Sequence, residues 1–447
     1  MGTASADIPV EALRTRYPEL FQKSLAKRFA PLLVLAGVLL YCLYAVWFFN
    51  IPTVIATAHW GRAGLYLSQW ISYDVIPEFR FHEGKVETRW SRFNVLGDNP
   101  HPAWIVAKDD GSVAVDILSP GNGLVIAPHA VTVLHDGETA TFDVSGDVPK
   151  PRGALPSWAS VDEDQISVRW GYWGAADIGT DRVRVVKKFL GWANFVFDTS
   201  SPFFGKSPVE VLKLVFFGAR IDPERSNLAF AFDNVWNNAD WQHGDVWTKL
   251  FQTIVMAFAG TLMAALAAFP LSFLAARNIT HNRLVNQGFK RFFDFQRSVD
   301  MLIWALFFTR AFGPGPLSGI GAIFFTETGT LGKLYSEALE NLDDKPPEGV
   351  RSVGASPLLI QRYGVLPQVF PVFASQTLYF WESNTRSATI IGAVGAGGIG
   401  LKLWEAMETN SNWANVFYMV ILILIVVYLF DNVSNRLRRR LIGDLPM

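Results

Sequence analysis

The sequence is poor in cysteine and in charge. Its 447 residues include one cysteine, Cys42, and only 18% charged residues, whereas soluble domains have about a quarter. A single cysteine excludes an intrachain disulfide and a cysteine metal cluster. The net charge of −1 provides no basic footprint, so no nucleic-acid partner is expected. Hydrophobic residues make up 50% of the chain, which favours a membrane protein.

The sequence also lacks a convincing nucleotide site. The run GAGGIG matches G-x-G-x-x-G, but its apolar surroundings provide no βαβ unit. We interpret Gly395, Gly397, Gly398 and Gly400 as a thin backbone that allows close helix packing. Segment 200–207 is one glycine short of a phosphate-binding loop. ATP chemistry is therefore expected in a partner, and no catalytic residue, metal ligand or cofactor is predicted in the chain.

The first long hydrophobic run covers residues 29–49. It carries no charge and is long enough to cross about 30 Å of hydrocarbon. A cleaved signal peptide is the alternative, but its apolar region would be shorter and would end in small residues. Here aromatic residues crowd the far end, as in an interfacial belt. We expect a retained membrane helix, with the polar and basic segment 1–28 in the cytoplasm.

Residues 50–247 contain no further span and are predicted to form an extracytoplasmic insertion. Short segments within it alternate apolar and polar residues between Gly, Asn and Asp turns. These segments are 112–117, 123–126, 130–134, 139–144, 165–170 and 181–186. The alternation predicts a small antiparallel β domain over about residues 74–187. Residues 188–245 are expected to be helical or irregular.

Hydrophobic segments resume in the region 248–431, which we interpret as a helical membrane core. The predicted spans cover 250–276, 300–312, 317–339, a segment that starts at Pro367 and breaks near 382–386, and 413–430. An apolar, glycine-rich run at 387–401 follows the break in the fifth span. The basic segment 277–297 and the basic tail 432–447 mark the cytoplasmic side. Six crossings would place these two segments and both termini on that side. The predicted fold class is an α-helical integral membrane protein with about six transmembrane helices and an inserted β-rich domain.

The stretch between the fourth and fifth spans is mixed in polarity. Pro346 is expected to start a short helix that Gly354 breaks. Pro357 is expected to start a second short helix, and Pro367 the next span. Val350 lies on an apolar face of the first short helix. A helix–glycine–helix elbow of this kind can dock into the groove of a partner.

This stretch resembles the coupling loop of bacterial ABC importer permeases. The pattern of that loop is Glu-Ala-Ala, three residues, Gly, nine residues and Ile-x-Leu-Pro. The positions that correspond to it, and that the resemblance implies contact the ATPase, are Glu348, Gly349, Val350, Gly354, Leu366 and Pro367. Gly349 and Val350 stand where the pattern has alanine, and Gly364 where it has isoleucine. An ordinary surface loop is the alternative interpretation.

Three polar residues interrupt the fifth span: Glu382, Asn384 and Arg386. Unpaired polar groups are costly in lipid, so these side chains should face protein, water or one another. A Glu382–Arg386 pair, four residues apart, could fix helix packing. Alternatively the three residues line a pathway in which Arg386 meets an anionic solute. Both interpretations remain open, and Glu327 marks a second polar cluster.

The region from about 299 to 400 resembles phosphonate importer permeases more closely. The stretches that carry the resemblance are 329–338, 363–368, 382–388 and 395–400. The resemblance implies a subunit of an ATP-driven importer in the lipid of the bacterial inner membrane, catalysing no covalent chemistry. It implies a second permease subunit, most simply in a homodimer, a cytoplasmic ATPase dimer and an extracytoplasmic solute-binding protein. The implied solute is a phosphonate or a related phosphorus oxyanion.

Two alternatives remain from the sequence. The same machine could carry another solute, such as phosphite, phosphate or an amino acid. The β-rich insertion has no counterpart in the family pattern, so the chain could instead be a membrane-anchored binding or sensor protein that works through this domain.

Overall fold

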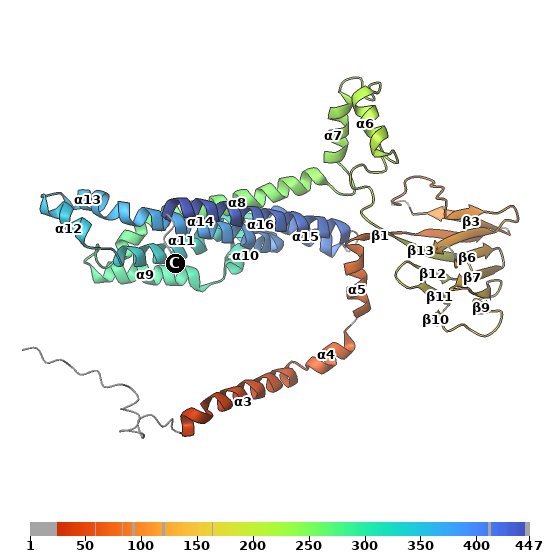
Figure 1. The fold of residues 1–447 in the computed structure, drawn as a ribbon, viewed down its shortest axis with the longest axis horizontal. Coiled ribbons are helices and arrows are strands. Elements are labelled where there is room, and N and C mark those ends of the chain that lie inside the picture. Colours follow the sequence, from red (N-terminus) through yellow and green to blue (C-terminus); the bar gives the residue numbers. More distant parts are fainter. Residues whose placement is uncertain are drawn as a thin grey trace, which may run out of the picture. The chain divides into compact units, whose positions relative to one another are not determined.

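The computed structural model describes residues 25–442, except 59, 83, 92–93, 119–120, 163 and 410–412. Residues 1–24 of the predicted cytoplasmic segment 1–28 and residues 443–447 of the predicted basic tail therefore lie outside the described residues. The chain divides into two compact units, Met1–Leu65 and Tyr66–Met447. Figure 1 shows the ribbon with its element labels.

The first unit contains α3 (Leu25–Phe48), α4 (Ile51–Thr57) and the start of α5 (Trp60–Gln69). The segment Phe29–Phe48 of α3 is long and apolar enough to cross a membrane. Its large apolar side chains are exposed on every face of the helix, as expected for contact with lipid. Asn50 adopts a left-handed conformation with φ of 50° and separates α3 from α4.

The first part of the second unit is rich in β structure. Its strands are β1 (Ser72–Val75), β2 (Pro77–His82), β3 (Lys85–Trp90), β4 (Ile105–Ala107), β5 (Val113–Leu118), β6 (Asn122–Ala127), β7 (Ala130–His135), β8 (Glu138–Asp143), β9 (Lys150–Pro151), β10 (Ala159–Asp162), β11 (Gln165–Trp170), β12 (Gly174–Ile178) and β13 (Arg182–Leu190). They form two antiparallel sheets. One has the order β10-β11-β12-β13-β2-β3, with β1 also paired to β13, and the other runs β4 to β9 in sequence.

One hydrophobic core joins the two sheets. Val113, Val115 and Ile117 of β5 alternate inward and belong to the same buried cluster as residues of β11 to β13. Trp170 of β11 donates its indole N–H to the carbonyl oxygen of Leu134 in the other sheet, at 3.0 Å. The β-rich part of the predicted fold class is thus confirmed, and the period-two pattern has the physical basis expected of a half-buried sheet.

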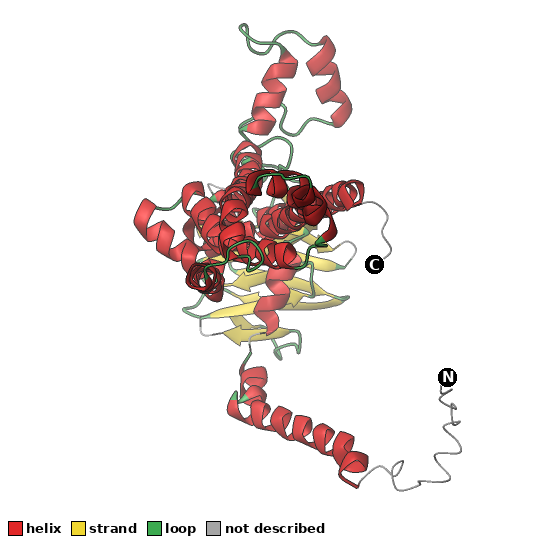
Figure 2. Ribbon diagram, turned by 90° about the vertical axis from the view of Figure 1, so that its left-hand side faces the viewer, coloured by secondary structure: helices red, strands yellow, loops and turns green. Residues whose placement is uncertain are grey.

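The remainder of the second unit is helical. Its elements are α6 (Pro208–Phe217), α7 (Asn227–Trp236), α8 (His243–Ala275), α9 (Arg283–Ser298), α10 (Met301–Phe312), α11 (Pro316–Glu340), α12 (Lys345–Ser352), α13 (Pro357–Ile360), the π-helical turn η1 (Gln361–Val365), α14 (Leu366–Ile391), the π-helical turn η2 (Gly392–Ala396), α15 (Gly398–Glu408) and α16 (Trp413–Ile442). Helices α8 to α16 form an elongated bundle, seen end-on in Figure 2. Helices α9, α12 and α13 lie at one end of it, and α15 lies near the other (Figure 1).

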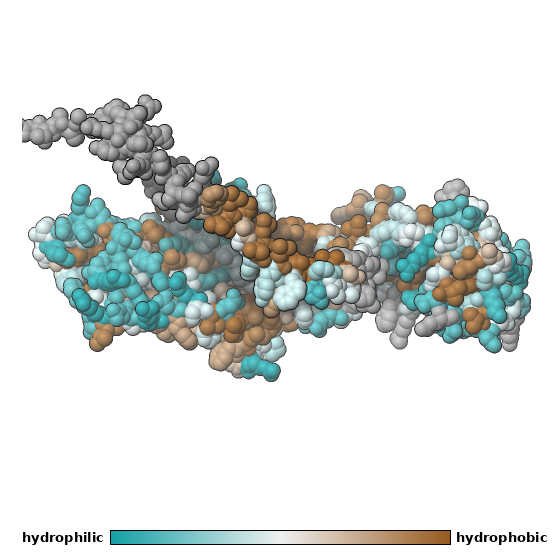
Figure 3. All heavy atoms as spheres, turned by 90° about the horizontal axis from the view of Figure 1, so that it is seen from below, coloured by the Kyte–Doolittle hydropathy of each residue, from teal (hydrophilic) through white to brown (hydrophobic). Residues whose placement is uncertain are grey.

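By length and composition, three helices among the described residues can cross a membrane, within α3, α8 and α16. The run Pro357–Ala396 and α15, bent by 58°, together make a fourth candidate. Helix α10 has only 12 residues, and α11 carries Glu327, Lys333 and Glu337 within its 25 residues. The helical membrane fold is confirmed, and six crossings stay a prediction. In Figure 3, hydrophilic residues cover the bundle end that carries α9 and α12, and hydrophobic residues gather further along.

One expectation about the fifth span is wrong. The predicted break at 382–386 is absent, because α14 continues unbroken to Ile391. The chain breaks instead at η2, where Gly395, Gly397 and Gly398 have φ between 70° and 102°, a region that glycine adopts without steric cost. The charged residues at 382 and 386 pair with each other at 3.4 Å, so they remain compatible with an intact helix.

Pro367 lies in the first turn of α14, as expected, but α14 does not begin as a separate helix. Helix α13, η1 and α14 form one continuous run, since the residues at their junctions have right-handed helical φ and ψ. Leu366 donates its backbone N–H to the carbonyl oxygen of Gln361, which is the wider i+5 spacing of a π turn. This widening accommodates a proline that has no N–H and would crowd the carbonyl four residues earlier.

Candidate functional site

Residues 345–367, which we call the coupling elbow, fold back on themselves. Helix α12 packs against η1, with Pro347 facing Gly364. A Cβ atom at Gly364 would lie 2.8 Å from the Cα atom of Pro347 and 3.1 Å from its nitrogen. Only a glycine permits this backbone-to-backbone approach. Gly364 is therefore a structural determinant of the elbow, although the sequence showed it only as a departure from the family pattern.

The turn of the elbow is open to solvent. Gly354 has φ of 81° and follows the end of α12, so it redirects the chain as the sequence predicted. Glu348 and Gly349 of α12 are exposed, and Val350 is half-buried. Apolar side chains surround this turn on the outside: Val353 is 81% exposed and Leu358 is 75% exposed. Large apolar side chains exposed together in this way mark a surface that suits contact with a partner protein.

The base of the elbow is braced. Gln368 donates its side-chain N–H to the carbonyl oxygen of Gly364 at 2.6 Å and to that of Asp343 at 3.4 Å. Leu366 is half-buried and packs on the core cluster that includes Leu339 and Val369, whereas Pro367 is exposed. The elbow is thus attached to the bundle at both of its ends.

Helix α9 supports the same end of the bundle. Phe293 fits against Gly332 of α11, and its carbonyl oxygen would lie 2.8 Å from a Cβ atom at Gly329. Lys333 of α11 forms an ion pair with Asp294 at 2.7 Å, and this hydrogen bond holds the pKa of the Asp294 carboxyl below its ordinary value. The two glycines are residues that sequence reasoning did not interpret, because their partners lie on a neighbouring helix.

The predicted pathway residues do not form one group. Glu382 lies between two arginines, at 3.4 Å from Arg386 on its own helix and 3.3 Å from Arg438 on α16. The Arg386 side chain is 56% exposed, whereas that of Glu382 is 11% exposed. The guanidinium of Arg386 is therefore both paired and accessible, so the pairing and the pathway interpretations are compatible.

Asn384 lies in the interior of the bundle. Its side-chain N–H donates to the hydroxyl of Thr261 on α8 at 2.9 Å, and the residue is 1% exposed. Glu327 of α11 is also buried, and its Oε2 atom has no hydrogen-bond partner among the described residues. Asn384 connects α14 to α8 and does not line a surface of the described chain.

The glycine-rich break packs between two other helices. The carbonyl oxygen of Gly395 accepts a hydrogen bond from the backbone of Gly315 at 3.0 Å. A Cβ atom at Gly397 would lie 3.0 Å from the same loop, and one at Gly398 would collide with Thr253 of α8. Gly400 faces the carbonyl oxygen of Thr389 across the bend. Each of the four glycines lies where a side chain would meet close neighbours.

Comparison with known proteins covers this same region. A family model described as "Binding-protein-dependent transport system inner membrane component" matches residues 268–442. The chain is 48% identical over 121 residues to a protein named as a cryptic phosphonate transport system permease, PhnE2 of Escherichia coli, covering 27% of this chain and 98% of that protein. The chain belongs to the binding-protein-dependent ABC importer permeases. Family members are membrane transport subunits, not enzymes.

Two further relatives of this permease differ in the solute for which they are named. The phosphite transport system permease protein PtxC of Stutzerimonas stutzeri is 37% identical over 190 residues, which cover 42% of this chain and 69% of that protein. The phosphate-import permease protein PhnE of Mycolicibacterium smegmatis is 34% identical over 198 residues, which cover 44% of this chain and 37% of that protein. As a member of this family, the chain is a multi-pass protein of the inner membrane. The family model begins at residue 268, beyond both β sheets.

Proposed function

We propose that this permease carries a phosphorus oxyanion across the inner membrane and couples its passage to an ATPase. The three relatives are named for phosphonate, phosphite and phosphate. These solutes share a small anionic phosphorus centre with several oxygen acceptors. A guanidinium group suits such an anion, because its planar N–H fork can donate two hydrogen bonds at once. The exposed guanidinium of Arg386 is our candidate for this contact.

The exposed turn of the coupling elbow is the observation that carries the coupling part of the proposal. Its apolar side chains occupy the outer end of the bundle, where a cytoplasmic ATPase would dock. Helix α13, η1 and α14 form a continuous run from Pro357 to Ile391. At about 1.5 Å per residue this run is roughly 50 Å long. Closure of two ATPase subunits would move the elbow, and the run would transmit that motion to the glycine-rich break.

The orientation and assembly follow from this proposal. The elbow, the basic helix α9 and both termini lie in the cytoplasm, and the β sheets lie outside. Two copies of the chain form the pathway, and a solute-binding protein delivers the anion from outside.

Orientation is tested with an impermeant thiol reagent on intact cells, in a Cys42→Ser background. Asp109→Cys should react, whereas Leu284→Cys, at an 82% exposed position of α9, should react only after lysis. The reverse pattern would refute the orientation.

The solute is tested by growth of a host strain that lacks its own transporters for phosphorus oxyanions. We expect the complete importer to restore growth on methylphosphonate, phosphite or phosphate as sole phosphorus source. A variant with Gly354→Val in the elbow should not restore growth. A methionine auxotroph that lacks its methionine importer serves as the control, and it should not be rescued. Rescue of the auxotroph without growth on any of the three phosphorus sources would contradict the proposed solute class.

A further inference from the structure

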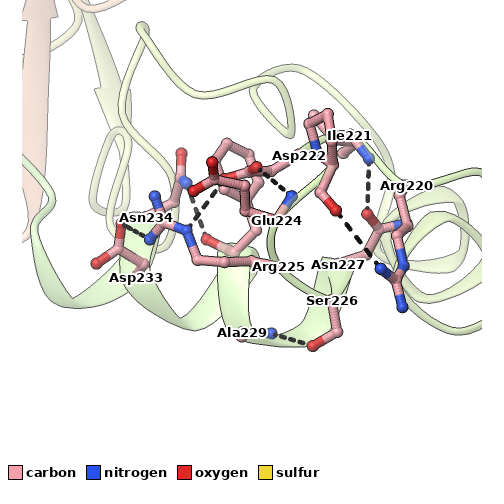
Figure 4. Close-up of polar contacts among 12 residues, drawn as sticks. Arg220, Ile221, Asp222, Glu224, Arg225, Ser226, Asn227, Ala229, Asp233 and Asn234 are labelled. Atoms are coloured by element: carbon pink, nitrogen blue, oxygen red, sulfur yellow. Dashed lines mark hydrogen bonds and ion pairs between the residues drawn. The ribbon is translucent and has the colours of Figure 1, made fainter.

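Helices α6 and α7 form a hairpin that is stabilised by its own polar groups. Ser207 and Glu210 form a capping box at the start of α6. At the other end, Asn227 donates to the carbonyl oxygens of Leu214 and Ala219, at 2.8 and 2.9 Å. It also accepts the backbone N–H of Ile221 at 2.9 Å (Figure 4). One asparagine thus satisfies backbone groups that α6 leaves open at its end. The hairpin has a defined fold of its own.

Positive and negative charges balance within the hairpin, and Arg225 pairs with two aspartates. Arg225 contacts Asp222 at 3.0 Å and Asp233 at 3.3 Å (Figure 4). Residues 206–236 contain four basic and four acidic residues, namely Lys206, Lys213, Arg220 and Arg225, and Glu210, Asp222, Glu224 and Asp233. The hairpin therefore has no net charge with which to attract an anionic surface.

Both helices expose an apolar stripe. Val209, Leu212 and Phe216 follow one another on α6 at spacings of three and four residues. Leu228, Phe232 and Trp236 follow at spacings of four on α7. These spacings place each set on one face of its helix, and all six side chains are exposed. We call this set the hairpin stripes. Large apolar side chains gathered in this way mark an interaction surface.

The hairpin stripes continue into the exposed apolar surface of α8. Trp236, at the end of α7, packs against Gly244 in the first turn of α8, where any side chain would collide with its ring. One turn further, Trp247 and Phe251 begin a series of exposed apolar residues along α8. Helix α8 is a membrane-spanning candidate, so an exposed apolar series along it suits contact with lipid. Figures 1 and 2 both show α6 and α7 lying across the direction of α8.

We propose that the α6–α7 hairpin lies in the membrane interface and rests its stripes on lipid. A helix that runs across a membrane span is parallel to the bilayer plane, as interfacial amphipathic helices are. Tryptophan at the junction with α8 suits the headgroup level. Because charges balance within the hairpin, apolar area and not headgroup charge drives the contact. With the orientation proposed above, the hairpin occupies the outer leaflet.

The test uses full-length permease with Cys42→Ser, reconstituted into phosphatidylcholine vesicles. A fluorophore sensitive to polarity is attached at Phe232→Cys, and a matched probe at Glu224→Cys reports the charged tip of the same hairpin. We expect blue-shifted emission at position 232 and quenching by spin-labelled lipid, but little quenching by aqueous iodide. Position 224 should show the opposite behaviour. Adding phosphatidylglycerol should change neither result.

Phe216→Cys on α6 repeats the measurement, in case the probe at position 232 disturbs folding. Equal quenching by iodide at positions 216, 232 and 224 would overturn the proposal, because the stripes would then face water. Shielding of positions 216 and 232 from both quenchers would also overturn it, since a second copy or another protein would then cover the stripes. Dependence of lipid quenching on phosphatidylglycerol would contradict the apolar mechanism.

Discussion

Gly364→Ala tests whether the backbone contact between Gly364 and Pro347 shapes the surface of the coupling elbow that docks on the ATPase. The added Cβ atom would lie 2.8 Å from the Cα atom of Pro347, whereas an ordinary contact is at least 3.4 Å. Helix α12 would have to move by about 0.6 Å to restore a normal van der Waals separation. Both partners are backbone, so no side chain can rotate to relieve the clash.

The cost of such overpacking is typically about 1–3 kcal/mol. Because α12 contributes no buried residue to the core, we expect the elbow to change shape while the bundle stays folded. If that cost appears in the docking equilibrium, the affinity for the ATPase falls about tenfold for every 1.4 kcal/mol. Solute-stimulated ATP hydrolysis should fall in proportion at limiting ATPase concentration.

The matched control is Gly349→Ala on the same helix; although Gly349 corresponds to a docking position, alanine is the residue that the family pattern has there. Gly349 has helical φ and open space around it, so alanine should be tolerated and should favour helix by up to about 1 kcal/mol. The assay compares solute-stimulated ATP hydrolysis and ATPase binding in reconstituted complexes of both variants with the native chain. Normal stimulation and binding in Gly364→Ala would refute the argument that the Pro347 contact shapes the docking surface.

Three further outcomes are expected. Gly354→Val forces a β-branched residue into left-handed backbone at a cost of about 1–2 kcal/mol, so stimulation of ATP hydrolysis should be lost. Gly354→Asn should retain most of this stimulation. Equal stimulation in the two variants would contradict the expectation. Arg386→Gln should abolish uptake without preventing assembly, because Glu382 keeps its partner Arg438. Arg386→Lys should reduce uptake in part. Near-normal uptake in both variants would reject a contact between Arg386 and the solute. Burial raises the pKa of Asp198, but hydrogen bonds from Ser200 and Ala239 outweigh it and leave that pKa below its ordinary value. The stabilisation is thus present above about pH 4 and is lost as the pH falls through the lowered pKa of Asp198 in the folded protein. Acid should therefore expose the connector 237–243 to protease, and Asp198→Asn should weaken this pH dependence. Identical pH profiles of proteolysis for the native chain and the variant would refute this expectation.

Local patterns predicted much of the fold. Alternation of apolar and polar residues located β5 to β8, β11 and most of β13, because each strand has one buried face. Strand β12 was missed, since its sequence GAADI has no large alternating residue. It is buried because Gly174 lets Ile117 of the other sheet approach closely. That contact lies between residues far apart in the chain, which no local pattern contains.

The site shows the same division. Spacing placed Gly354 at a turn, because a glycine that follows a short helix is a local signal. The contact between Gly364 and Pro347 could not be predicted, since it arises only when the elbow closes. The break in the fifth span was placed at 382–386 because charges interrupt the apolar pattern there. The second partner of Glu382, Arg438, lies 56 residues away, and only the folded bundle shows that this charge is accommodated within a helix.

Uptake of radiolabelled methylphosphonate into proteoliposomes tests the central claim most directly. The vesicles contain the permease and its ATPase, and the solute-binding protein is added on the side of the β sheets. We predict accumulation that requires ATP and the binding protein, that is competed by excess phosphite or phosphate if they share the pathway, and that is lost with Gly354→Val but kept with Gly349→Ala. Uptake that persists without ATP, or that is unaffected by Gly354→Val, would contradict the account.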